Sequence, residues 1–115
     1  MKFDDYQKEI IKYDIDAPQN PQNPADPGFM SKVLGLGGEA GEAQEKIKKI
    51  LRDKGGKMTD EDREEIAKEL GDVIWYVATI ARYLDVPFSK VAEMQLEKAQ
   101  SRLERGKLHG SGDNR

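Results

Sequence analysis

Two long runs of residues with helical periodicity dominate this sequence, and a pair of glycines separates them. In each run apolar residues recur every three or four positions, as one face of an α-helix requires. The pattern predicts one helix from about Phe29 to about Asp53 and a second from about Glu61 to about Leu84. Residues 55–56 are glycines in terminator position, and Thr59 or Asp60 then offers an N-cap. The two helices are therefore expected to pack antiparallel.

The rest of the chain predicts two shorter helices and no strand. Residues 3–15 and residues 88–104 also carry apolar residues at helical spacing. Residues 16–28 read "DAPQNPQNPADPG" and hold four of the five prolines, so this segment is neither helix nor central strand. It is either a flexible connector or a loop that closes over a ligand. The sequence thus predicts an all-α four-helix bundle over residues 1–105, followed by a polar, glycine-rich tail over residues 106–115.

Length and charge exclude several classes of protein. The chain has 115 residues, which fits one small domain. Its formal net charge is −3 and its basic residues are interspersed with acids, so it lacks the basic footprint expected for binding a nucleic-acid polymer. There is no cysteine for a disulfide or thiolate metal site, and no apolar run approaches a membrane span. The first residues, "MKFDDYQKEI", are too acidic for a signal peptide, so a cytoplasmic protein is expected.

A glycine-rich stretch lies inside the first long helix. The run "GLGGEA" matches G-x-G-x-x-A through Gly35, Gly37 and Ala40, but a dinucleotide-binding fold needs a preceding strand and a βαβ unit, and the chain offers neither. Four glycines fall within seven residues, and each costs a helix about 1 kcal/mol relative to alanine. We therefore expect close approach to this backbone, by a neighbouring helix or by something bound.

Each long helix also carries a pair of acids three residues apart. Glu39 and Glu42 form one pair and Glu69 and Asp72 the other, and both pairs flank their apolar stripes on the same side. If the helices pack antiparallel, four carboxylates converge, and a hard cation such as Mg²⁺ or Mn²⁺ is then expected. The alternative is a solvated surface, since the chain has 22 acids. The single histidine, His109, lies in the tail, so the Glu-x-x-His motif of di-iron bundles is absent.

These motifs resemble a known family. The stretch "GEAGEAQEKIKK" followed by "EIAKELGDVIWYVATIARYLDV" resembles the MazG-like all-α nucleoside triphosphate pyrophosphohydrolases, which carry Glu-x-x-Glu on one helix and Glu-x-x-Asp on the next. The resemblance covers roughly Phe3 to Arg115, and the ending "RGKLHGSGDNR" looks like the tail of a MazG-like subgroup.

The resemblance implies an activity and a set of site residues. The four acids of the two pairs are expected to bind Mg²⁺, and a nucleoside triphosphate is expected to be hydrolysed to the monophosphate and pyrophosphate. One of the four acids, or Glu45, orients or deprotonates the water. On the last helix Lys98 and Arg102 match family positions that meet the phosphates, while Gln95 stands where the family often has Asn. The implied purpose is nucleotide-pool control or the clearing of abnormal nucleotides.

Three further residues have two interpretations each. Lys46 follows Glu42 by four, which favours an ion pair within the helix over a contact with phosphate. Trp75 faces away from the main stripe of its helix, in "DVIWYVATIA", which is apolar nearly all round. We therefore expect a homodimer or homotetramer with Trp75 in the interface rather than stacked on a base. Tyr76 lies near the carboxylates, where packing is favoured over substrate contact.

Two alternatives stay open at this stage. The first alternative, also an enzyme of this class, is a phosphoribosyl-ATP or dUTP-type pyrophosphohydrolase. It stays open because no residue dictates which base is accepted. The second alternative is a non-catalytic helical protein that binds a metal or a partner. Release of pyrophosphate separates the two classes.

Overall fold

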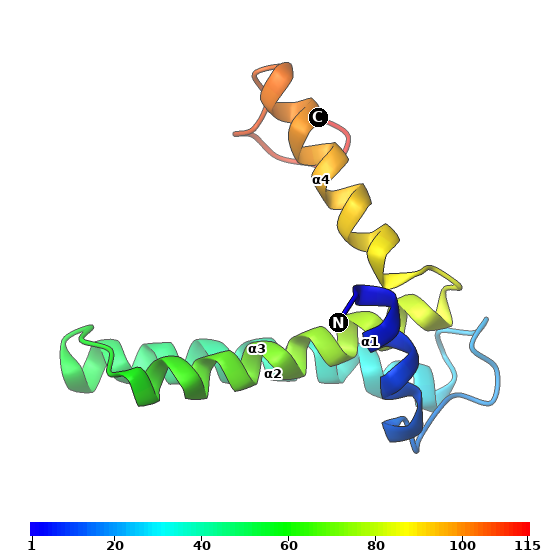
Figure 1. Cartoon of the computed structure of the whole chain (residues 1–115), viewed down its shortest axis with the longest axis horizontal. Helices are drawn as coiled ribbons and strands as arrows, with labels where there is room; N and C mark the ends of the chain where they lie inside the picture. The colour runs from blue at the N-terminus through cyan, green and yellow to red at the C-terminus, as the bar shows by residue number, and fades with distance from the viewer.

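The computed structural model describes residues 1–115, and the fold is entirely helical. The long helices α2 and α3 lie side by side as an antiparallel hairpin, and α1 crosses one end of it (Figure 1). The prediction of an all-α fold with two long central antiparallel helices is confirmed. In chain order the elements are α1 (Phe3–Glu9), the 3-10 helix η1 (Ile10–Tyr13), α2 (Pro27–Lys54), α3 (Asp60–Tyr83) and α4 (Phe88–Glu104).

The start of α2 is fixed by the last residues of the proline-rich segment. The Asp26 side chain accepts a hydrogen bond from the Gly28 backbone N–H at 2.9 Å and caps the helix. Pro27 occupies the first turn, where its missing N–H leaves no bond unmade. The helix therefore begins two residues before the predicted Phe29.

The turn between α2 and α3 follows the expected chemistry. Gly55 adopts φ 61° and Gly56 adopts φ 84°, left-handed values that a glycine reaches without steric cost. Thr59 is the N-cap of α3: its side chain accepts from the Asp62 N–H, and the Asp62 carboxylate accepts in return from the Thr59 N–H. The pKa of Asp62 falls to about 2 because of this backbone hydrogen bond and the ammonium of Lys54. Residues within the turn itself thus end α2 and start α3.

A buried glutamine joins α1 to the opposite end of the hairpin. The Gln7 side chain donates to the carbonyls of Ala78 and Val86, at 3.1 and 3.0 Å, and accepts from the Phe88 N–H at 3.1 Å. Ile10, Ala78 and Phe88 form the small apolar core around this junction. The N-terminal helix therefore fixes the bend between α3 and α4.

A second buried polar cluster attaches the segment after η1 to the hairpin. The Asp14 carboxylate lies 2.9 Å from the Lys32 ammonium and 2.7 Å from the Arg82 guanidinium, and it accepts a hydrogen bond from the Tyr83 hydroxyl. The Lys32 ammonium also donates to the Asp16 carbonyl at 3.1 Å. Because α2 supplies Lys32 and α3 supplies the other two partners, this Asp14 cluster holds Tyr13 and its neighbours against both long helices.

The fourth helix does not fold back onto the hairpin. It extends away from the junction and carries the C-terminus with it (Figure 1). The radius of gyration is 16.9 Å, against about 13 Å for a compact domain of this length. Several large apolar side chains on α3 and α4 are consequently exposed by 43–67%: Leu70, Ile74, Met94, Leu96 and Leu103. None of the helices has both the length and the apolar character needed to cross a bilayer.

Candidate active site

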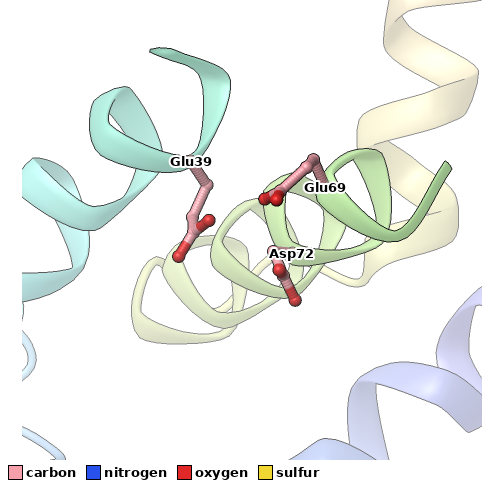
Figure 2. Close-up of side chains that lie close together, drawn as sticks. All are labelled: Glu39, Glu69 and Asp72. Atoms are coloured by element: carbon pink, nitrogen blue, oxygen red, sulfur yellow. The ribbon is translucent and has the colours of Figure 1, made fainter. Parts of the chain in front are cut away.

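Three of the four predicted acids converge between α2 and α3. Glu39 reaches from α2 toward Glu69 and Asp72 on α3, and one carboxylate oxygen from each lies within 4.8 Å of the others (Figure 2). Asp72 is exposed, whereas Glu39 and Glu69 are half-buried in the seam between the helices. We call these three residues the acid cluster. Glu69 and Asp72 share a face of α3 because they are three residues apart, and the antiparallel hairpin brings Glu39 of α2 opposite them.

Two oxygens of the acid cluster are buried without a partner. The Oε2 atoms of Glu39 and of Glu69 are inaccessible to solvent and accept no hydrogen bond. The pKa of Glu39 is raised because burial disfavours its charge, and the nearby carboxylates of Glu42, Asp72 and Glu69 add to this effect. A buried carboxylate with only like charges around it is unfavourable unless a cation compensates it.

The donor set of the acid cluster fits a divalent metal ion. All its ligand atoms are carboxylate oxygens, which hard cations prefer, and the two orphaned oxygens face no competing donor. A cation there would supply the missing partners of Glu39 and Glu69. The structure therefore has a site at which a metal can be held by residues of both long helices.

Glu42 and Glu45 lie outside the group of three. Glu42 is exposed, one turn beyond Glu39, and close enough to contribute to the raised pKa of Glu39. Glu45 is also exposed and pairs with Lys48 at 3.3 Å. Only Glu42 of these two therefore adjoins the acid cluster.

Lys46 has different partners from the one expected. Its ammonium lies 2.9 Å from Glu69 and 3.3 Å from Glu65, both on α3, rather than against Glu42 on its own helix. The prediction of an ion pair was right in kind but wrong in partner, because helical spacing does not show which side chains the neighbouring helix presents. The pKa of Lys46 is raised, first by the hydrogen bond to Glu69. One side of Glu69 is therefore neutralised while its other oxygen stays unpaired.

The two cations predicted on the last helix lie on α4 and are engaged by the tail. Lys98 contacts the Asp113 carboxylate at 3.0 Å, and Arg102 donates to the Asp113 carbonyl at 2.8 Å. Because α4 extends away from the hairpin, one chain does not bring these cations to the acid cluster (Figure 1). Gln95 is exposed on the same helix.

The glycine-rich stretch has one clear structural reason. A Cβ at Gly35 would lie 2.3 Å from the ring of Tyr76, so only glycine allows the ring to rest on the α2 backbone. This is the close approach by a neighbouring helix that the sequence predicted. At Gly37, Gly38 and Gly41 nothing lies within 4 Å, and the chain itself gives no reason for these glycines.

Two tyrosines near the acid cluster were not predicted as site residues. Tyr6 of α1 lines a cavity with Gly71, the neighbour of Asp72, and its pKa is raised by burial and then by the charge of Asp72. Tyr13 lines a cavity of about 360 Å³ together with Glu39, Asp72 and Trp75. No local motif marks either tyrosine, because both are brought to the site by contacts that are distant in sequence.

Comparison with known proteins identifies the family. Residues 29–106 match the MazG nucleotide pyrophosphohydrolase domain, and the chain belongs to this family. The match contains both acid pairs and α4. The "Gene 37 protein" of Mycobacterium phage L5 is 57% identical over 70 residues, which cover 61% of this chain and 61% of that protein. The chain thus matches about three-fifths of the length of that relative. No solved structure matches the chain.

Proposed function

We propose that the chain hydrolyses nucleoside triphosphates to nucleoside monophosphates and pyrophosphate with the help of Mg²⁺ or Mn²⁺. The observation that carries this proposal is the acid cluster, in which Glu39, Glu69 and Asp72 converge and two oxygens lack any partner. Membership of the MazG family supports the reaction class. The biological role that follows is control of nucleotide pools or removal of abnormal nucleotides, in the cytoplasm as the sequence predicts.

The residues of the site divide into two tasks. Glu39, Glu69 and Asp72 hold the cation, and Lys46 keeps Glu69 oriented through its 2.9 Å contact. A bound divalent cation neutralises charge on the triphosphate and makes water more acidic. Glu42 stays exposed beside Glu39 and is the carboxylate free to orient the attacking water and accept its proton. Glu45 is turned toward Lys48 and takes no part.

The phosphates need cations of their own. Lys98 and Arg102 are proposed to meet them, with Lys46 as the cation already beside the acid cluster. Since α4 leaves the hairpin of its own chain, we propose that a homodimer or homotetramer places it against the hairpin of another copy. The exposed apolar side chains of α3 and α4 support such an assembly. Light scattering checks it, since a particle of 13.0 kDa at micromolar concentration contradicts the oligomer.

The decisive experiment is pyrophosphate release from a panel of nucleotides with and without Mg²⁺. The panel contains ribo- and deoxyribonucleoside triphosphates, the corresponding diphosphates and phosphoribosyl-ATP, so the preferred member also gives the subtype. We expect release from at least one triphosphate only when the metal is present. No release from any nucleotide by the folded protein contradicts the proposal and favours a non-catalytic metal- or partner-binding protein.

A matched pair of variants on α3 tests the site itself. Asp72→Asn removes the charge of a proposed metal ligand, and we expect turnover to fall at least about 100-fold. Mutation of residues that only hydrogen-bond to metal ligands already lowers activity by about 10- to 100-fold. Glu64→Gln removes the same charge from an exposed residue of the same helix that forms no ion pair, and full activity is expected. Equal activity of the two variants contradicts the assignment of the acid cluster.

A further inference from the structure

The first turn of α4 is capped by side chains of α1 rather than by its own N-cap residue. Pro87 stands at the N-cap position, and its side chain makes no capping hydrogen bond. The Asp4 carboxylate of α1 instead accepts hydrogen bonds from the Ser89 backbone N–H at 2.8 Å and from the Ser89 hydroxyl at 2.7 Å. One residue earlier, the Phe88 N–H donates to the Gln7 side chain at 3.1 Å. Two backbone donors that a helix leaves free at its start are therefore satisfied by a separate helix.

The link between Asp4 and Ser89 has the properties of a strong contact. Asp4 is half-buried, and its pKa is lowered, first by the hydrogen bond from the Ser89 backbone N–H and then by the bond from the Ser89 hydroxyl. Hydrogen bonds to a charged acceptor are stronger than those between neutral groups, and the negative charge also faces the positive end of the α4 dipole. The two residues are 85 positions apart, so this contact ties the start of the chain to its last helix.

The base of α4 is held from α1, whereas most of the helix projects away from the hairpin (Figure 1). The Phe88 ring packs on those of Phe3 and Tyr6, with centroids 5.0 and 6.1 Å apart. Beyond Ser89, the hydrogen-bonding side chains of α4 bind one another or the tail. Apolar packing has little directional preference, whereas a hydrogen bond weakens steeply when it is bent. The hydrogen bonds from α1 therefore set the angle at which α4 leaves the junction.

A small change of this angle is amplified along the helix. Lys98 lies nine residues beyond Ser89, and Arg102 lies thirteen residues beyond it. At 1.5 Å per residue these separations are about 14 and 20 Å, so a tilt of about 15° at the base would move the two cations by roughly 4 and 5 Å. A misplacement of about 1 Å in an active site can already cost about 100-fold in rate. The direction of α4 thus decides where its two cations lie.

We propose that Asp4 is a positioning residue for the reaction: it fixes the direction of α4 and, with it, the place at which Lys98 and Arg102 meet the phosphates. The proposal rests on the proposed function, in which these two cations bind the triphosphate. Asp4 acts through Ser89 and contacts no substrate. The acid cluster lies on the hairpin and does not depend on this link.

A pair of variants separates positioning from helix capping. Asp4→Ala removes the link between α1 and α4. Adding Pro87→Ser gives α4 an N-cap of its own, because a serine hydroxyl at this position accepts from the backbone N–H of Ser89 or Lys90. The double variant Asp4→Ala/Pro87→Ser therefore restores the cap of α4 without restoring its connection to α1.

The kinetics of pyrophosphate release, with the triphosphate that wild type prefers, give the first result. We expect kcat/KM to fall about tenfold or more in Asp4→Ala and to stay low in the double variant, because the displaced cations no longer meet the phosphates. Recovery of kcat/KM in the double variant overturns the proposal, since Asp4 would then only cap α4, and so does an unchanged kcat/KM in Asp4→Ala. The stability gained from Mg²⁺ reports on the acid cluster and should be unchanged in both variants. Its loss in either one overturns a role confined to α4.

Asp5→Ala is the matched control. Asp5 is the next residue of α1, it is exposed, and its carboxylate accepts only the Lys2 N–H, at 3.4 Å, so wild-type activity is expected. If Asp4→Ala fails to fold by circular dichroism, Ser89→Ala takes its place, because it removes only the hydroxyl contact. We expect Ser89→Ala to lower kcat/KM about twofold or more. Wild-type activity of this variant then overturns the proposal.

A distance measurement tests the direction of α4 without turnover. The chain has no cysteine, so Lys57→Cys in the turn of the hairpin and Glu104→Cys at the end of α4, both exposed, carry a unique pair of spin labels. Refolding with an excess of unlabelled protein limits the signal to distances within one chain. We expect the distance distribution of wild type to shift or broaden by several Å in Asp4→Ala and in the double variant, but not in Asp5→Ala. An unchanged distribution in Asp4→Ala overturns the proposal.

The positioning role and the proposed function fail in different ways. No pyrophosphate release by wild type, together with changed distances in Asp4→Ala, contradicts the function and leaves Asp4 as the residue that directs α4. Pyrophosphate release by wild type, together with distances and kcat/KM in Asp4→Ala that equal those of wild type, contradicts the positioning role and leaves the function standing.

Discussion

Asp14 packs against the α2–α3 hairpin and Glu39 lies on it, and both carboxylates are withdrawn from water, but the charges around them are opposite in sign. Burial alone would raise the pKa of Asp14, yet hydrogen bonds and charge from Tyr83, Lys32 and Arg82 outweigh it, and the pKa lies below its usual value. Around Glu39 burial and neighbouring carboxylates act together, and the pKa is raised. The Asp14 carboxylate is paired with cationic side chains of the chain, whereas Glu39 forms no ion pair and its Oε2 atom accepts no hydrogen bond. Under the proposed function, this difference separates a carboxylate that supports the fold from carboxylates that bind a metal ion.

The largest expected effect comes from removing the charge of Asp14. Its side chain is 1% exposed, and Asp14→Asn leaves the buried Lys32 without its counter-charge. We expect the free energy of unfolding to fall by about 3–5 kcal/mol, as measured for broken buried pairs. Urea denaturation without metal measures it. Asp16→Asn, at an exposed residue two positions on, serves as control and should stay within about 0.5 kcal/mol of wild type.

The two sites should respond to pH in opposite directions. The pKa of Asp14 is lowered, so its contribution to stability is present above the ordinary value of 3.8 and is lost as the pH falls through the folded-state pKa. The pKa of Glu39 is raised, so its contribution is present below the ordinary value of 4.5 and is lost as the pH rises through the folded-state pKa. Metal-free wild-type protein should therefore lose stability as the pH rises above 4.5, and Glu39→Gln should abolish this loss. Urea denaturation midpoints measured across this pH range check the prediction. If Glu39→Gln leaves their pH dependence unchanged, the carboxylates of the acid cluster are not destabilised by being unpaired.

A smaller effect is expected at the boundary of the acid cluster. Lys46 is the cation that pairs with Glu69, and both long side chains are partly open to solvent. Lys46→Met should lower metal-free stability slightly and increase the extra stability gained from Mg²⁺, because the carboxylates then have no internal cation. Thermal melts with and without the metal measure both quantities. A gain from Mg²⁺ no larger than in wild type contradicts this role of Lys46.

Much of the fold was predictable because its signals are local. The helix caps at Thr59 and Gly55 and the apolar spacing of the long helices depend on residues that are close in sequence. The convergence of Glu39 with Glu69 and Asp72 followed from helical phase and an antiparallel hairpin. These parts of the structure need no knowledge of the remaining chain.

The rest depended on contacts distant in sequence. Helical phase placed Lys46 on a face but did not identify Glu69 as its partner. Nothing in the spacing of Tyr13 showed that the Asp14 cluster would hold it beside Trp75. The course of α4 away from the hairpin was also hidden, because the apolar pattern of a helix does not specify which chain covers it.

Free energy of unfolding at pH 7 with and without Mg²⁺ tests the central claim most directly, that the acid cluster is built for a divalent cation. The account predicts an increase of about 1.4 kcal/mol at ten times the dissociation constant in wild type, and none in Asp72→Asn or Glu39→Gln. The same increase in wild type and in both variants, or no increase in any of them, would contradict it.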